Sequence, residues 1–243
     1  MSALKTSQSK DTSSRKELRE DRIVTLYAKA WMFFDENRNL VYAGLAGLGL
    51  LMVGIAGYVY YQSQQQVEAE ELLAQVARTY EQGRYREALD GTGNAQGLLA
   101  IAENYGSTQA GNLATYYAAD ALYRLGEYDR ALELFRDFEK TDDFIGASAY
   151  AAQAAIHETR SEYEEAAALY QQAAEQFPNS LTTPKYMIDA GQALEEAGDF
   201  DAAVAMYERV DAEYADSEPA QDVPRYIARA RAKQASSAAP SGS

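Results

Sequence analysis

The longest hydrophobic segment of the chain runs from Leu40 to Tyr61 and contains no charged side chain. A helix of these 22 residues is about 33 Å long at 1.5 Å per residue, which matches the roughly 30 Å hydrocarbon core of a bilayer. A helix buried in a soluble core rarely runs so far without a polar side. The pattern therefore predicts one transmembrane helix over residues 40–61.

Basic residues are distributed unequally on the two sides of this segment. In the twenty residues after it the only Lys or Arg is Arg78, whereas eight precede it: Lys5, Lys10, Arg15, Lys16, Arg19, Arg22, Lys29 and Arg38. The positive-inside rule places the N-terminus in the cytoplasm and residues 62–243 outside it. The 39-residue leader and the long apolar run favour an uncleaved signal anchor over a cleaved signal peptide.

The residues before the span divide into two parts. Residues 1–14 are polar and lack hydrophobic periodicity, which predicts disorder. Residues 15–39 show apolar side chains at helical spacing, which predicts an amphipathic juxtamembrane helix ending in the polar break of residues 35–39. Such a helix either lies on the lipid surface, with Trp31 and Phe34 at interfacial depth, or docks on a partner.

Within the span, small residues recur on one helical face and form a candidate helix–helix contact. This transmembrane small-residue face consists of Ala43, Gly47, Gly54 and Gly57. Other small residues, such as Gly44 and Gly49, lie off the face, and glycine is common in spanning helices.

A short pattern recurs four times after the span: a small residue, an aromatic two positions later, Ala three later and, in the last three copies, an aromatic four after that. The sets are Gly83, Tyr85, Ala88; Gly126, Tyr128, Ala131, Phe135; Ser161, Tyr163, Ala166, Tyr170; and Gly198, Phe200, Ala203, Tyr207. The copies are 43, 35 and 37 residues apart.

Each residue type in this pattern has a physical role in a pair of helices. The Gly or Ser ends the first helix in a left-handed or tight turn. The first aromatic is expected to wedge between the two helices, the Ala lets them approach closely, and the later aromatic faces the next pair. Because each pair leaves apolar surface that only a neighbour can cover, the pattern predicts an all-α solenoid of about four units.

This pattern resembles the tetratricopeptide repeat, in which a proline often stands near the end of the unit, as Pro178 does here. The resemblance covers roughly residues 67–234, within an exported repeat domain of residues 62–234. The first unit departs from it, and an irregular, lengthened second helix centred on residues 96–105 is expected there. Residues 219–234 are expected to form a closing helix with Tyr226, Ile227 and Ala230 inward, before a disordered tail over residues 235–243.

The order of leader, span and repeats is similar to that of membrane-anchored ancillary subunits of the bacterial Sec translocon, which are related to periplasmic repeat proteins of the Tol–Pal system. The segments that carry this closer resemblance are residues 110–132 and 226–233. The resemblance implies a single-pass protein of the bacterial inner membrane with a periplasmic repeat domain and a chaperone-like role near the translocon. The alternative is an envelope scaffold of the Tol–Pal or cell-division type without chaperone activity. The implied partners are proteins: translocon subunits, emerging exported chains or envelope proteins.

Composition excludes several other classes of function. Residues 62–243 carry 14 basic and 31 acidic side chains, a balance that argues against nucleic acid and anionic lipid as ligands. The chain has no Cys and one His, His157, so thiolate chemistry and the common zinc sites are excluded. No nucleotide-binding loop is present, and residues 90–101 fail the EF-hand pattern because Ala95 and Ile101 stand where Gly and Glu are required. No catalytic residue, metal, cofactor or small-molecule substrate is predicted.

The candidate binding surface is the concave groove that the tetratricopeptide resemblance implies, lined by the first helix of each unit. Its predicted residues are Tyr116, Asp120 and Tyr123 in the second unit, Ala155 and Glu158 in the third, and Lys185, Ile188 and Gln192 in the fourth. Tyrosine suits extended peptides because it combines a large apolar face with a polar tip. The alternative is that most of the 19 tyrosines build the interior. The Lys/Asn set with which some relatives hold a peptide's terminal carboxylate is absent.

Overall fold

A computed structural model describes residues 31–93 and 95–238 of the chain. The expectations for residues 1–14, and for the amphipathic segment up to residue 30, lie outside the described residues. The chain divides after Tyr61 into two units, residues 1–61 and 62–243, and each is described by itself.

Residues 31–36 of the first unit are helical, and a turn at Asn37 separates them from helix α2 (Arg38–Glu81), whose residues 62–81 belong to the second unit and supply the first helix of the first repeat. The polar break predicted over residues 35–39 is therefore confined to Asn37, whose side-chain amide donates to Phe33 O at 3.1 Å. The apolar window of α2 has a mean hydropathy of 2.0, and none of it is buried. Among the described residues, α2 is the one helix long and apolar enough to cross a membrane.

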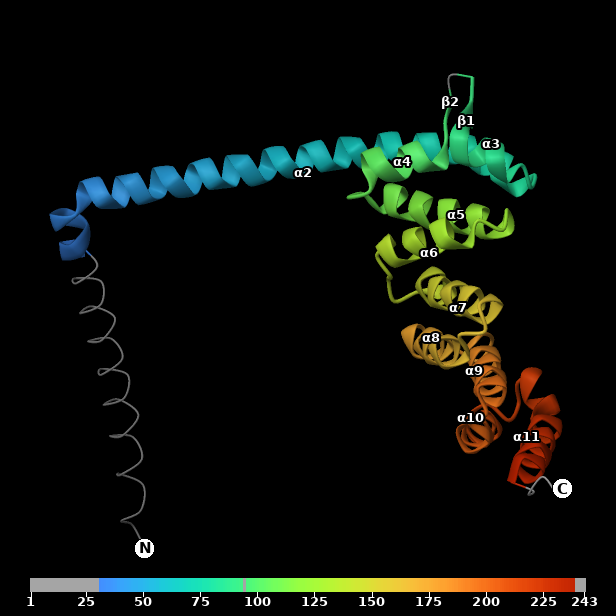
Figure 1. The fold of residues 1–243 in the computed structure, drawn as a ribbon. Coiled ribbons are helices and arrows are strands. Elements are labelled where there is room, and N and C mark those ends of the chain that lie inside the picture. The colour runs from blue at the N-terminus through green and yellow to red at the C-terminus, as the bar shows by residue number, and fades with distance from the viewer. Residues whose placement is uncertain (1–30, 94, 239–243) are drawn as a thin grey trace, which may run out of the picture. The chain divides into compact units, whose positions relative to one another are not determined.

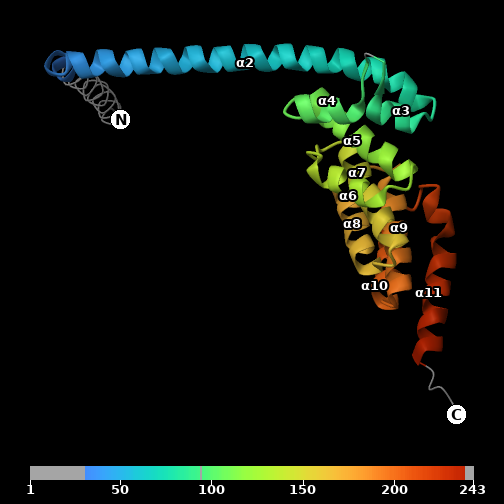
Figure 2. The same cartoon turned by 45° about the horizontal axis from the view of Figure 1, so that its top comes forward.

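The second unit is an array of helices that stack in chain order from α5 to α10 (Figure 1, Figure 2). Its elements after α2 are α3 (Tyr85–Asp90), β1 (Gly91–Thr92), β2 (Ala95–Gln96), α4 (Leu98–Tyr105), α5 (Gln109–Arg124), α6 (Tyr128–Asp137), α7 (Phe144–Thr159), α8 (Tyr163–Gln176), α9 (Thr183–Ala197), α10 (Phe200–Glu213), the 3-10 turn η1 (Pro219–Asp222) and α11 (Val223–Ala238). The second, third and fourth repeats are the pairs α5/α6, α7/α8 and α9/α10. The predicted all-α array of about four helix pairs is confirmed.

The turn between the two helices of each pair has one conformation in all four repeats. The small residue of the sequence pattern has a positive φ in every copy: 74° at Gly83, 78° at Gly126, 60° at Ser161 and 87° at Gly198. In each copy the amide of the next residue also reaches back to a carbonyl five positions earlier, as Glu127 N does to Leu122 O at 2.9 Å. The predicted left-handed helix end is confirmed, and Ser161 holds a conformation that L-residues adopt at a cost.

The alanine of the pattern lies at the closest approach of the helices. Its four copies, Ala88, Ala131, Ala166 and Ala203, have no exposed surface. The later aromatic is also buried, whereas the first aromatic is not fully enclosed: Tyr128 is 36% exposed, and its ring packs on Tyr123 at an interplanar angle of 52°. The expectation that the first aromatic fills the space between the two helices is therefore wrong for the second repeat. Ala131 and Phe135 already fill that space.

The first repeat contains an insertion rather than a lengthened helix. Its second helix is split into α3 and α4 by an antiparallel hairpin, β1–β2. The hairpin begins at Gly91, where φ is 81°, and the chain returns at Gly97, where an added Cβ would lie 2.1 Å from Leu89 O. The two ends of the seven-residue segment 91–97 therefore lie close together, so that α4 begins near the point where α3 ends.

The repeat spacing agrees with this interpretation. Removing seven residues from the 43-residue gap leaves 36, between the 35 and 37 of the other gaps. The buried residues then also fall at helical spacing across the junction, from Ala88 to Leu98, Ile101 and Tyr105.

Two hydrophobic cores follow each other along the array, and α7 contributes to both. Ala149 and Ile156 of α7 lie in the core of the first two repeats. Ala147 and Ala154 of the same helix lie in the core formed by the last repeats and α11. Small side chains on α7 therefore let helices pack against both of its sides.

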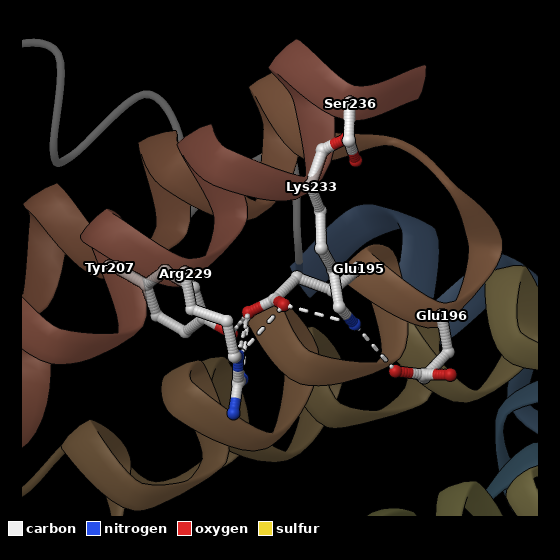
Figure 3. Close-up of polar contacts among 6 residues, drawn as sticks. All are labelled: Glu195, Glu196, Tyr207, Arg229, Lys233 and Ser236. Carbon is white, nitrogen blue, oxygen red and sulfur yellow. Dashed lines mark hydrogen bonds and ion pairs between the residues drawn. The ribbon is translucent and has the colours of Figure 1, made fainter. Parts of the chain in front are cut away.

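The closing helix α11 is fixed to the fourth repeat by a buried carboxylate. Glu195 at the end of α9 has a side chain that is 1% exposed, and three groups converge on it (Figure 3). Tyr207 donates its hydroxyl at 2.8 Å, Arg229 of α11 donates at 2.8 Å, and the Lys233 ammonium lies 3.4 Å away. Burial raises the pKa of Glu195, but the hydrogen bonds from Arg229 and Tyr207 outweigh burial and leave the pKa below its usual value. A paired, charged Glu195 thus holds α11 in place.

The predicted closing helix is present, with Ala230 buried and with Tyr226 and Ile227 half-buried. It runs on to Ala238, into the segment expected to be a disordered tail. Ser236 and Ser237 lie in this last turn, and their hydroxyls donate to Lys233 O and Gln234 O, three residues earlier.

We expect Ser161→Gly to stabilise the protein by about 1 kcal/mol, because glycine adopts a positive φ without the steric cost that serine bears. Thermal unfolding followed by circular dichroism should show a rise of about 2–4 °C in the midpoint. The reciprocal change, Gly198→Ser, should lower the midpoint by a similar amount. A fall in midpoint with Ser161→Gly would contradict the shared turn geometry.

Deleting residues 91–97, so that Asp90 joins Leu98, should give a continuous second helix in the first repeat. We expect unfolding to remain cooperative, with an unchanged or higher midpoint, because the deletion preserves the helical spacing of the buried residues. Circular dichroism at 222 nm should show a higher helical signal per residue. Deleting seven residues of α4, 98–104, is the matched control and should destabilise the array because it removes Leu98 and Ile101 from the core.

Candidate partner-binding face

The first helices of the repeats present the surface that the sequence identified as the groove. On α5 the side chains of Gln109, Leu113, Tyr116 and Asp120 recur at i, i+4, i+7 and i+11 and so lie on one side of the helix. We call this side of α5, together with the neighbouring sides of α7 and α9, the first-helix face.

A pocket of about 270 Å³ lies at one end of the first-helix face, between α5 and the start of α7. It is lined by Gln109, Asn112, Leu113, Phe138, Thr141, Asp143 and Ile145. Its shape is set by Asn112, whose amide donates to Glu139 O at 2.9 Å and accepts from Glu139 N at 2.8 Å. Asp143 caps α7 by accepting from Gly146 N at 2.8 Å. The connection between α6 and α7, which supplies Phe138, Thr141 and Asp143 to the pocket, is therefore tied to both α5 and α7.

Tyr116 connects this pocket to the rest of the face. Its ring packs on Phe138 of the pocket wall and on buried Phe135, with centroids 5.6 and 5.9 Å away. Burial, with a smaller contribution from the nearby Asp120 charge, raises the pKa of Tyr116 to about 12. Tyr116 is half-buried, and it contacts the core through Phe135 and the pocket wall through Phe138.

Asp120 lies further along α5 and is held by groups from two helices. It accepts from the hydroxyl of Tyr80 on α2 and from Arg124 Nε at 2.5 Å. Burial and the hydrogen bond to Asp120 raise the pKa of Tyr80, so this hydroxyl stays protonated and donates. Asp120 thus has both a neutral donor and a cationic partner.

Glu158 lies near the C-terminal end of α7, the middle helix of the face, and has different surroundings. Tyr170 of α8 donates its hydroxyl to Glu158 Oε2 at 2.9 Å. Burial first, and then the Glu158 charge, raise the pKa of Tyr170. Among the described residues no basic side chain comes within 4.0 Å of the Glu158 carboxylate, whereas Asp189 on α9 pairs with Lys185 at 2.5 Å.

Most of the predicted groove residues lie at least partly at the surface. Tyr116, Asp120, Tyr123, Ala155, Glu158 and Gln192 are half-buried, and Lys185 is exposed. Ile188 is only 5% exposed and belongs to the second core, so the expectation that it lines the groove is corrected. Asp189, one residue further on, takes the place at the surface because the rotation of α9 is set by packing of Met187 and Ile188.

The sequence reasoning missed Gln109, Leu113 and Ile145 at the pocket, and Tyr186, whose hydroxyl lies 3.4 Å from Ser148 Oγ. Extending the seven-residue spacing backward from Tyr116 to Gln109 would have found the α5 residues. Phe138, which follows α6 and lines the pocket, has no comparable signal in the sequence.

The small-residue face predicted for the span belongs to the first unit. Ala43, Gly47, Gly54 and Gly57 are exposed along α2, and an added Cβ at any of the three glycines would meet no atom within 4 Å. A role in helix association stays a prediction.

The remaining chemically reactive group is His157, near the end of α7. Its Nδ1 lies 2.5 Å from Glu162 Oε2 across the turn to α8, where it joins the two helices of the third repeat. No group of three or more His, Cys, Asp or Glu side chains within the described ranges is placed to hold a metal ion.

Comparisons with known proteins agree with this architecture. Two family models described as tetratricopeptide repeat match the chain, one over residues 113–142 and one over residues 147–210. Among solved structures, the TPR-like repeats of a Podosopora anserina kinesin light chain match with a TM-score of 0.53 at 15% identity, covering 70% of this chain and 88% of that one. A variant of those repeats with one substitution matches with the same score and identity and with 87% of its own length covered. No curated protein matches the chain significantly.

These comparisons support the fold. They do not support a relationship to translocon or Tol–Pal proteins, for which the sequence resemblance remains the only support. The family models cover the second, third and fourth repeats, where the turn geometry and the buried alanines are also repeated. Residues 62–238 thus form an all-α helical repeat array, and residues 113–142 and 147–210 of it match the tetratricopeptide repeat, a protein–protein interaction module.

Proposed function

We propose that this protein is a membrane-tethered interaction module: α2 spans the bacterial inner membrane, the N-terminus is cytoplasmic, and the repeat array is periplasmic. The charge-free run of residues 40–61 and the excess of basic residues before it support this topology. The 31 acidic side chains after the span suit a domain that stays soluble beside a membrane without adhering to anionic lipid.

The first-helix face is the surface that binds partners in this proposal. The observation that carries it is the pocket beside Tyr116, because it adjoins a surface on which half-buried tyrosines and carboxylates alternate. Tyrosine rings contribute apolar contact at a low entropic cost, and their hydroxyls and the carboxylates bind backbone and polar groups. Such a surface suits extended segments of many sequences.

The specific role we propose is that of a chaperone-like accessory of the protein translocon, which meets chains as they emerge. The sequence resemblance of the leader, span and repeats to ancillary translocon subunits supports this assignment. An envelope scaffold of the Tol–Pal type uses the same fold with a lasting partner. Because the two roles differ in the partner bound, capture of that partner discriminates between them.

The proposed topology predicts the behaviour of reporters fused after Ser243. A reporter that is active only outside the cytoplasm should be active there, and one that is active only in the cytoplasm should be inactive. The same two reporters fused after Arg38 are the control and should give the reverse result. Cytoplasmic activity after Ser243 would overturn the proposed location of the repeat array.

The proposed binding face predicts where partners can be captured in living cells. A photo-crosslinking amino acid at Gln109, beside the pocket, or at Gln192 of α9 should give adducts. The same group at Gln172, exposed on the second helix α8, should give few. Mass spectrometry of the adducts should identify translocon subunits or newly exported chains. Adducts with Tol–Pal or division proteins alone would favour the scaffold role, and adducts only at Gln172 would show that the face is misassigned.

A further inference from the structure

The connections between successive repeats lie along one edge of the array. The two helices of each repeat run in opposite directions, so the turns inside the repeats lie at one edge and the connections between repeats lie at the other (Figure 1). We call the second of these the connector edge. It consists of the connections α4–α5, α6–α7 and α8–α9, which are residues 106–108, 138–143 and 177–182.

Hydrogen bonds join these connections in order along the edge. Asn112, near the start of α5, donates to Glu139 O of the next connection at 2.9 Å. Gln176, at the end of α8, donates to Thr141 O at 2.9 Å and to Asp142 Oδ1 at 3.0 Å. The connector edge is therefore one bonded strip from the second repeat to the fourth.

The chain enters the array at the same edge. Gln62, the first residue after the predicted span, donates its side-chain amide to Ser107 O at 2.7 Å. One turn later, Gln66 accepts from Ala110 N at 3.2 Å. Because Gln62 is bonded to Ser107, the residue at which a spanning α2 leaves the bilayer lies at one end of the connector edge.

Large apolar side chains are exposed along this edge. Phe144, the first residue of α7, is 53% exposed, Phe177 is 40% exposed and Leu181 is 78% exposed. Phe144 and Phe177 are each within two residues of the bond that joins Gln176 to Asp142. The exposed apolar side chains of the opposite edge, Leu125 and Tyr128, are less exposed, at 37% and 36%. An apolar strip of this kind marks an interaction surface.

The charged groups next to these side chains are bonded within the edge. Asp143 caps α7, and the Lys140 ammonium donates to Phe135 O at 2.6 Å and to Phe138 O at 2.9 Å. Residues 62–243 carry 31 acidic and 14 basic side chains, so an anionic lipid surface repels the array. The surface that suits the connector edge is therefore apolar below an electrically neutral headgroup layer.

We propose that the connector edge rests on the outer surface of the membrane that holds the span, with Phe144, Phe177 and Leu181 inserted among zwitterionic lipid headgroups. Phe and Leu side chains of peripheral proteins enter this layer. The inference rests on the proposed function, because it requires α2 to span the membrane. It gives the array a second attachment to the lipid, and it holds the pocket lined by Phe138 and Thr141 beside the surface at which exported chains emerge.

The test uses the full chain in phosphatidylcholine vesicles that contain a lipid with a nitroxide on its headgroup. Because the chain has no Cys, a single introduced cysteine can carry a fluorophore. Leu181→Cys on the connector edge and Leu125→Cys on the opposite edge are the matched pair. We expect the nitroxide to quench the label at position 181 and not the label at position 125. Replacing part of the phosphatidylcholine with phosphatidylglycerol should weaken the quenching.

A second set of variants tests whether the apolar side chains hold the edge on the lipid. The fluorophore is placed on Ser180→Cys, and Phe144→Ser and Leu181→Ser are added one at a time and then together. Each should lower the ratio of docked to undocked arrays by about tenfold, as expected when a large apolar side chain is lost from apolar surroundings. The melting midpoint should not change, because both side chains are exposed. Leu125→Ser is the control and should keep the quenching.

Three results would overturn the inference, and they are distinguishable. Absence of quenching at position 181, in protein that floats with the vesicles, refutes lipid contact and leaves the proposed span and binding face standing. If a photo-crosslinker at position 181 then captures an envelope protein in cells, the edge is a protein-binding surface instead. Quenching at position 180 that persists in the double variant refutes insertion of the apolar side chains. Protein that does not float with the vesicles refutes the span, and the inference fails with it.

Discussion

Close approach of helices at a single small residue is the constraint on which the rest of the array depends. The alanine at this position has no exposed surface in any of the four repeats, from Ala88 to Ala203. A larger side chain would separate the two helices, and the separation would propagate because each pair also packs on its neighbour. The repeated turn acts with the alanine, since its positive φ sets the angle at which the second helix returns.

The helix α7 joins this packing to the candidate site. It contributes Ala149 and Ile156 to one core and Ala147 and Ala154 to the other, so its rotation and position are determined from two sides. The side chain of Glu158 is carried on the same helix. A carboxylate on so constrained a helix can be held in place before a ligand arrives, which reduces the ordering cost of binding.

Two carboxylates in the array show how surroundings decide the role of one residue type. Glu195 is buried and receives Arg229 and Tyr207, so its charge is satisfied internally and serves to dock the closing helix. Glu158 receives only Tyr170 among the described residues, so its charge is available to a ligand. The difference arises because α11 brings Arg229 and Lys233 to Glu195, whereas the Lys185 ammonium of α9, the helix that shares a core with α7, pairs with Asp189 instead.

The sequence by itself determined the features that depend on local periodicity: the apolar segment of residues 40–61, the helix pairs, the left-handed turns and the buried alanines. Each can be predicted because its signal lies in neighbouring residues, and the signals of the helix pairs, turns and alanines also recur along the chain. The tertiary structure decided that Ile188 faces the core and Asp189 the surface, that a hairpin divides the first repeat, and that Phe138 closes a pocket. These depend on how far each helix rotates to pack against its neighbours, and that rotation is set by contacts between residues far apart in the chain.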